Sequence, residues 1–148
     1  MTNFLDSVKI LTAMDAAGAG TTTLTGSIVI DTMGFEEVTM IASLGDVAVS
    51  CAPVLKVHQG DNTTTLAAIT GAASNAITAT ATSLDLKKLG VTVIKPLKRY
   101  MIAVLERPGG NAVLNDITCI LSKPRVMPTG TNGVAGDVVA GAIVAPTA

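Results

Sequence analysis

The sequence is a succession of short β-rich runs separated by turn signals. Runs such as "EEVTMIASLG" and "VLKVHQG" alternate apolar and polar residues, and "GDN" at 60–62 and "PGGN" at 108–111 are turn-forming stretches. Sustained amphipathic helical periodicity is missing, apart from a single helical turn expected in "DLKKLG" at 85–90. This pattern disfavours a helix bundle or a parallel α/β sheet. It predicts an all-β protein, an antiparallel sandwich of about seven or eight strands.

The segment "RYMIAVLERPGGN" at 99–111 predicts a strand in the centre of the sandwich. Both faces of its apolar run, 100–105, are hydrophobic, which is typical of a central strand covered on both sides. The "PGGN" turn and the returning run "AVLNDITCILSKP" predict a β-hairpin. We therefore expect a strand pair in the middle of the domain.

Other runs predict which side chains face the core. Val38, Met40 and Ala42 share one face of the first long run, after a turn near Met33–Gly34. In the next run Cys51, Pro53, Leu55 and Val57 share a face, and Pro53 marks a bulge or an edge because proline cannot donate to a ladder. Residues 63–83 are rich in Ala and Thr. There the many Thr and the central Gly71 favour short strands and loops over a helix.

Three regions follow from these patterns. Residues 1–25, with "DAAGAGTTTLTG", have no sustained period and predict an N-terminal arm with at most a short strand or turn at Val8–Leu11. Residues 26–127 form the sandwich domain. Residues 128–148 form a C-terminal arm whose "VVAGAIV" needs an apolar surface to cover it. That surface is either a partner's or, if the tail adds a strand, its own domain's.

The composition is low in charge. Charged residues make up 14% and hydrophobic residues 49% of the 148 residues, whereas a soluble domain carries about 25% charged residues. Such a surface is expected when much of it lies against other subunits, or when the domain is simply small and modestly polar. No apolar run is long enough for a transmembrane helix, and the charged N-terminus does not resemble a signal peptide. Cys51 and Cys119 are expected to be buried and reduced.

Charge is unevenly distributed along the chain. Residues 1–86 hold two lysines against eight acidic residues, a net of −6, and residues 87–125 hold eight basic against two acidic residues, a net of +6. Either folding mixes the two segments and cancels the difference, or the chain presents a basic face to an acidic protein surface, or subunits dock on one another by patches of opposite charge. Nucleic acid is not expected as a partner, because the basic segment lacks interleaved aromatic residues for base stacking.

Side chains for catalysis are scarce. His58 is the only histidine and is expected on the surface at a strand end rather than in a catalytic triad. No motif typical of a metal, cofactor or nucleotide site is present, and the adjacent Glu36 and Glu37 would point to opposite faces of a strand. We therefore expect no enzyme activity, no catalytic residues, no metal and no cofactor.

Several short motifs carry a resemblance to a known family. They are "IDT-x-GF" at Ile30–Phe35, "K-R-Y" at Lys98–Tyr100, "P-x-G-N" at Pro108–Asn111 and "K-P-R" at Lys123–Arg125. Between residues 28 and 128 the chain resembles the small cement or decoration proteins on the capsids of tailed bacteriophages, the short-tailed ones in particular. The resemblance implies a β-sandwich of jelly-roll type with extended N- and C-terminal arms.

The resemblance also implies a structural role in the virion. Such proteins bind the outer surface of the phage head, bridge major capsid subunits and stabilise the shell against the pressure of packaged DNA. The expected partners are the major capsid protein and further copies of the chain, as a homodimer or else a homotrimer, with assembly in the host cytoplasm and no membrane contact. The candidate contact residues are Phe4, Phe35, Lys87, Lys88, Lys98, Arg99, Tyr100, Lys123 and Arg125.

Alternatives remain at this point. Phe35 and Tyr100 could serve core packing instead of an interface. A jelly roll could also be a carbohydrate-binding module, although the chain has few aromatic residues to stack on a sugar, or it could be a neck or tail component of the virion.

Overall fold

A computed structural model describes Phe4, residues 7–125 and the short stretches 134–135 and 138–139. Almost all of its regular structure is β. The strands are β1 (Val8–Met14), β2 (Ala17–Gly20), β3 (Leu24–Thr25), β4 (Ile30–Asp31), β5 (Phe35–Val47), β6 (Val54–Gly60), β7 (Ala67–Ala73), β8 (Lys88–Ile94), β9 (Tyr100–Glu106), β10 (Ala112–Pro124), β11 (Val134–Ala135) and β12 (Val138–Val139).

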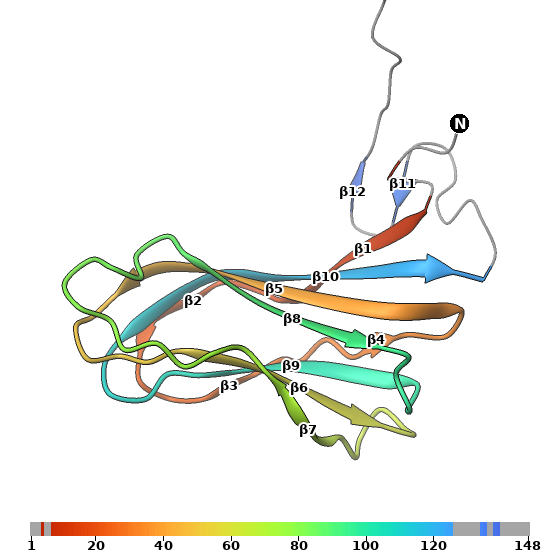
Figure 1. Ribbon diagram of the computed structural model, residues 1–148, viewed down its shortest axis with the longest axis horizontal. Helices are drawn as coiled ribbons and strands as arrows, with labels where there is room; N and C mark the ends of the chain where they lie inside the picture. The colour runs from red at the N-terminus through yellow and green to blue at the C-terminus, as the bar shows by residue number, and fades with distance from the viewer. Residues whose placement is uncertain (1–3, 5–6, 126–133, 136–137, 140–148) are drawn as a thin grey trace, which may run out of the picture.

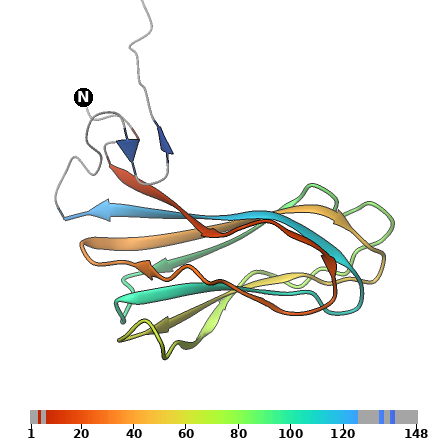
Figure 2. The same cartoon turned by 180° about the vertical axis from the view of Figure 1, so that it is seen from behind.

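Two antiparallel sheets pack face to face (Figure 1). We call the first sheet A, with strand order β1-β10-β5-β8 and β2 also paired to β10. The second, sheet B, has the order β3-β9-β6-β7, with β4 also paired to β9. The reverse view in Figure 2 shows the same two layers with β1 on the near side. The expected all-β antiparallel sandwich is confirmed.

The pairing of strands is that of a jelly roll. The first strand of the domain pairs with the last, β1 with β10, and pairing then proceeds inward along the chain. β3 and β4 pair with β9, β5 pairs with β8, and β6 pairs with its sequence neighbour β7. With β3 and β4 counted as one interrupted strand and β2 set aside, these eight strands have the nested pairing of a long hairpin rolled into two sheets, which is the jelly-roll topology.

The core lies between the sheets and follows the expected alternation. Val38, Met40 and Ala42 of β5 are buried, as are Leu55 and Val57 of β6. β9 is buried from Met101 through Leu105 and lies between β6 and β3–β4, so the expected central strand is confirmed. Met101, Ala103 and Leu105 of β9 belong to the core between the sheets, together with residues of β5 and β10.

The predicted hairpin at the "PGGN" turn is wrong. β9 belongs to sheet B and β10 to sheet A, so the turn carries the chain from one sheet to the other. Gly109 sits in this turn with φ of +85°, a left-handed conformation that glycine adopts without strain. The turn signal was correct, but a turn alone does not specify which strands will pair.

The predicted N-terminal arm is wrong from Val8 onward. β1 pairs with β10 over most of its length, and Ala13 and Met14 lie in the core. β2 also pairs with β10, and β3 pairs with β9, so residues 8–25 contribute to both sheets. The sandwich therefore begins near residue 8 rather than at residue 26. Most of the expected C-terminal arm, 128–148, lies outside the described residues, except that β11 and β12 pair with each other.

Two smaller expectations have different outcomes. The helical turn at 85–90 is replaced by turns over 81–86 and the start of β8, so Gly90 lies inside a strand. Cys51 and Cys119 are buried and free, as expected. Burial raises the pKa of Cys119 to about 12 and also raises that of Cys51, so both thiols stay protonated at neutral pH.

Candidate functional site

One end of the sandwich brings together three of the four motifs that carry the family resemblance. β4 pairs with the start of β9, which places Asp31 opposite Tyr100, and Pro124 pairs with Phe35. The Arg125 amide also donates to the Gly34 carbonyl at 2.9 Å. We call this region the Met33 end, comprising residues 31–35, 94–100 and 123–125, at the right of Figure 1. The fourth motif, 108–111, lies at the opposite end.

The β4–β5 turn at this end is tight because its sequence satisfies its own backbone. Ile30 anchors the turn in the core at 2% exposure, and the Phe35 amide donates to the Thr32 carbonyl at 3.1 Å. Gly34 has φ of +91°, which few other residues tolerate. The Asp31 carboxylate accepts a hydrogen bond from the Met33 amide at 3.0 Å. The turn is thereby fixed with Met33 at its tip.

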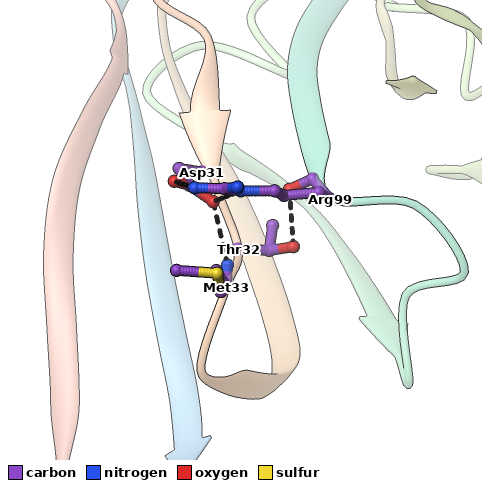
Figure 3. Close-up of polar contacts among 4 residues, drawn as sticks. All are labelled: Asp31, Thr32, Met33 and Arg99. Carbon is purple, nitrogen blue, oxygen red and sulfur yellow. Dashed lines mark hydrogen bonds and ion pairs between the residues drawn. The ribbon is translucent and has the colours of Figure 1, made fainter. Parts of the chain in front are cut away.

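Arg99 fastens this turn to the β8–β9 loop (Figure 3). Its Nε donates to Asp31 Oδ1 at 2.9 Å and its Nη2 donates to Oδ2 at 2.7 Å, a bidentate pair. From the other side, the Thr32 amide and hydroxyl both donate to the Arg99 carbonyl, at 2.9 and 2.7 Å. Two adjacent residues thus grip both the side chain and the backbone of Arg99.

The electrostatics of this clamp follow from its geometry. Hydrogen bonding from Arg99, with the Met33 amide and charge attraction adding to it, holds the pKa of Asp31 below its ordinary value of 3.8 against a smaller desolvation effect. The same hydrogen bond raises the pKa of Arg99. The guanidinium carbon lies 5.1 Å from the centre of the Tyr100 ring, a cation–π contact. The arginine is therefore held by three neighbours at once.

Large apolar side chains protrude around the clamp. Met33 is 67% exposed, Ile94 is 65% exposed and Leu97 is 90% exposed. They come from the β4–β5 turn, the end of β8 and the β8–β9 loop, and the last two of these segments adjoin Arg99. Single exposed apolar residues are ordinary, but here three lie at the same end of the sandwich, where a partner could cover them.

Basic residues at the Met33 end are mostly neutralised. Lys98 pairs with Asp61 and Lys123 pairs with Glu37, as Arg99 does with Asp31. Hydrogen bonding to Glu37 raises the pKa of Lys123. In the described part of the chain, no ion pair involves Lys95 or Arg125.

The ion pairs show how folding brings the acidic and basic segments together. Each of the four in the described residues joins one member from residues 1–86 to one from residues 87–125, including Lys56 with Glu106. Three of them neutralise a basic residue of the segment 87–125, so folding cancels part of the charge difference along the chain.

The candidate contact residues fall in several places. Lys98, Arg99, Tyr100, Lys123 and Arg125 lie at the Met33 end together with Phe35, which is half-buried against the core. Tyr100 is half-buried beside Arg99. By contrast, Lys87 and Lys88 lie at the other end of β8, a strand length away. Phe4 is 61% exposed and precedes β1.

Sequence reasoning missed the most exposed residues of this site. Met33 occupies the variable position of "IDT-x-GF". The signal that could have identified it is its apolar side chain at the centre of a turn. Leu97 stands between Pro96 and Lys98 in a loop, where an apolar residue is equally unusual. Asp31 could not be found this way, because its partner Arg99 lies 68 residues later.

Arg107 is a second residue whose role was missed. It is 3% exposed, and its guanidinium donates to the carbonyls of Gly18, Thr22 and Ala112 at 2.7 to 2.9 Å and to the Thr22 hydroxyl at 3.2 Å. These bonds tie the β2–β3 segment to the start of β10 at the end opposite Met33. The role of Arg107 is therefore structural, because its hydrogen bonds connect separate segments of the fold.

A shallow groove of about 550 Å³ lies at that same opposite end, lined in part by Asp46, Val49, Asp85 and Asn111. The carboxylate of Asp85 in this groove already accepts a hydrogen bond from the Val47 amide at 2.8 Å. Among the residues that the structure describes, no three His, Cys, Asp or Glu side chains are grouped so as to hold a metal ion. Within the same residues, no helix has the length and hydrophobicity to span a membrane.

No family model matches the chain, and no curated protein matches it at a significant level.

Proposed function

We propose that the chain is a capsid decoration protein of a tailed bacteriophage, which binds the outer surface of the head and bridges major capsid subunits. The observation that carries this proposal is the Met33 end. Three of the motifs that resemble the decoration family converge there, on a turn clamped by Asp31 and Arg99 that holds Met33 out to solvent.

The arrangement suits docking better than chemistry. A clamped turn loses little conformational freedom when a partner covers it, so more of the contact energy remains as affinity. Met33 and Leu97 supply the apolar centre of such a contact, and the ion pairs around them supply a polar rim. Lys95 and Arg125, which form no ion pair within the described residues, are the cations suited to steering onto an acidic shell.

The mechanism is mechanical. A rigid sandwich that bridges two shell subunits adds an interface that must break before the shell can open. A standard protein interface buries about 1,600 Å² in total, and weaker contacts suffice when one particle engages several at once, because the later contacts form at high effective concentration. Packaged DNA then pushes against more interface than the shell alone provides.

Binding to heads that were assembled without this chain tests the proposal. Met33→Asp and Leu97→Asp each place a charge in the apolar centre, and we expect each to weaken binding about tenfold or more, as measured by co-sedimentation with the heads. Val49→Asp is the matched control, because Val49 is 59% exposed at the opposite end.

All three variants should unfold in urea at the same midpoint as the unmodified chain, since each replaces an exposed residue. If the Met33 and Leu97 variants saturate the heads as the unmodified chain does, the Met33 end is not the docking surface. If the unmodified chain itself fails to bind, the decoration role is refuted.

A further inference from the structure

β8 is an open edge of sheet A. It pairs with β5 in an unbroken register from Glu37 opposite Ile94 to Ser43 opposite Lys88, and with no other strand of the described chain. No charged residue interrupts it between Leu89 and Ile94. A regular edge without charged residues along its centre is a template for pairing with another chain, and natural proteins usually protect such edges.

The other sheet edges show that protection. β3 and β4 have two residues each, which is too short to template a ladder. β7 pairs irregularly with β6, and Gly71 within it has φ of +82°. β1 has a register shift between Thr12 and Met14, and β11 lies beside it. β8 alone among these edges is both long and regular, although lysines stand at its two ends.

The hydrogen-bond pattern shows which groups of β8 face outward. The Lys95 amide donates to the Glu36 carbonyl at 2.7 Å, and the Leu44 amide donates to the Lys87 carbonyl at 2.9 Å. Bonded and non-bonded pairs alternate along an antiparallel ladder. The odd-numbered residues of β8 therefore bond to β5. The amides and carbonyls that point away from β5 are those of Lys88, Gly90, Thr92 and Ile94.

We propose that a second copy of this chain pairs with this edge, β8 against β8, about a twofold axis at Val91. In that register Lys88 faces Ile94 of the partner subunit, and Gly90 faces Thr92 of the partner subunit. All of these residues have outward-facing backbone groups, so each such pair can exchange two hydrogen bonds. Sheet A then continues across the two subunits.

The side chains of β8 match in the same register. On the outer face, Gly90 leaves space beside the threonine that faces it, and the Lys88 stem can cover the partner's Ile94, which is 65% exposed in the single chain. On the inner face, the half-buried Leu89 meets the half-buried Val93 of the partner subunit. The strand "KLGVTVI" therefore places compatible side chains opposite one another when it is paired with its own reverse.

This self-complementarity is the reason to assign the edge to a second copy rather than to a foreign strand. Lysines oppose the pairing only at the ends, where Lys87 and Lys95 of the two copies approach. Because those charges repel and salt screens them, added salt should strengthen the dimer. An acidic foreign strand held by the same lysines would be weakened by salt instead.

Sedimentation velocity of the full chain over a range of concentrations is the first test. We expect a monomer–dimer equilibrium that shifts toward dimer as concentration and salt rise. Gly90→Lys should weaken dimerisation about tenfold or more, because it sets added positive charges on both sides of the axis. A side chain fits there in the monomer, since the nearest atom to a Cβ at Gly90 is the Met40 carbonyl oxygen at 4.0 Å.

Gly18→Lys is the matched control, because Gly18 is an exposed strand glycine of the same sheet, and a Cβ added there would have no atom within 4 Å. It should dimerise like the unmodified chain. A chain that stays monomeric at every concentration overturns the proposal, and so does a dimer or trimer that Gly90→Lys leaves intact.

Disulfide trapping tests the register. Val91 meets its own copy at the axis as a non-bonded pair, where Cα atoms lie about 4.5 Å apart and a disulfide can form. Val91→Cys should therefore give a covalent dimer under mild oxidation. Ile94→Cys should give far less, although Ile94 is the more exposed residue, because the two copies of Ile94 lie on opposite sides of the axis. Faster trapping through Ile94→Cys contradicts this register.

The dimer bears on the proposed function without depending on it. Antiparallel pairing of β8 sends the two Met33 ends in opposite directions, so one dimer carries two docking surfaces. Dimerisation is measured on the purified chain and head binding on assembled heads, so either proposal can fail alone.

Discussion

At the residue scale, Asp31 takes part both in the hydrogen bonding of the β4–β5 turn and in the ion pair with Arg99. Its carboxylate accepts from the Met33 amide and from two nitrogens of Arg99, and its side chain is about half exposed. Water and salt screen such a pair, so its contribution to stability is modest even though its geometry is bidentate. Its larger effect is to fix where Met33 points.

We predict that Asp31→Asn lowers the free energy of unfolding by about 0.5–1 kcal/mol at neutral pH, measured by urea denaturation. The pKa of Asp31 is lower in the folded chain than its ordinary value of 3.8. The stabilisation is therefore present above pH 3.8 and is lost as the pH falls through the lower folded-state value.

The difference between the two proteins should accordingly shrink as the solution is acidified below pH 3.8. Asp46→Asn, which changes an exposed carboxylate with no ion pair in the described residues, should show no such difference at neutral pH. A gap between Asp31→Asn and the unmodified chain that grows on acidification would contradict this assignment.

For Arg107 we predict a large effect on the free energy of unfolding, because this residue is buried. Replacing it by methionine, which keeps much of its volume, leaves the carbonyls of Gly18, Thr22 and Ala112 without their donors. We expect a loss of about 2–3 kcal/mol in the free energy of unfolding. Lys87→Met, at an exposed position, should stay within about 0.5 kcal/mol of the unmodified chain. Equal losses would show that the guanidinium bonds contribute little.

At the scale of elements, the sequence predicts strands well where their alternation is unbroken. β5 keeps one phase from Val38 to Leu44, and β6 keeps one phase from Leu55 to Val57, so the core faces expected there were readable. Within β1 only a short strand or turn at Val8–Leu11 was expected, because the register shifts between Thr12 and Met14 and breaks the period of two. An interrupted pattern of that kind looks like the irregular sequence of an arm.

Pairing between strands was much less readable than the strands themselves. The turn after β9 was predicted correctly, but its two strands lie in different sheets. The partners of Arg99 and Lys98 in the Met33 end lie in segments far away in the sequence. Composition can show that acidic and basic segments exist, whereas only the fold decides which residues meet.

The β9–β10 turn allows a direct test at this scale. Gly109 has φ of +85°, and a Cβ there would lie 2.3 Å from the Ser50 carbonyl oxygen. We predict that Gly109→Ala costs about 1–3 kcal/mol of stability, from backbone strain and the forced shift of the β5–β6 loop. Gly18→Ala, with open space around it, should be neutral or slightly stabilising in the same urea titration. If Gly109→Ala proves as stable as its control, the close approach of these loops is refuted.

At the scale of the whole molecule, the N-terminal strands are part of the sandwich. Because β1, β2 and β3 pair with β9 and β10 and bury Ala13 and Met14, removing residues 1–25 should abolish folding. We expect circular dichroism of the truncated chain to show no cooperative thermal transition. Asp15→Ala, an exposed change in the same segment, should melt like the unmodified chain. A truncated chain that still melts cooperatively would restore the interpretation of this segment as an arm.

The architecture of the whole molecule also indicates how it could act. In the described residues the two sheets enclose one core, a clamped turn lies at the Met33 end, and β8 forms an open edge of sheet A. We propose that the protein acts through binding at these surfaces. The copy number of the chain in its assembly is therefore the quantity that separates a shell-wide decoration protein from a neck or tail component.

The most direct measurement is quantitative mass spectrometry of gradient-purified particles of the phage that encodes this chain, with the major capsid protein as the internal reference. We predict a ratio to the major capsid protein of one, or a simple fraction of one such as a half or a third, as expected for a protein bound across the whole shell. Absence of the chain from particles, or a ratio so small that only a single ring of copies is present, would contradict the decoration role.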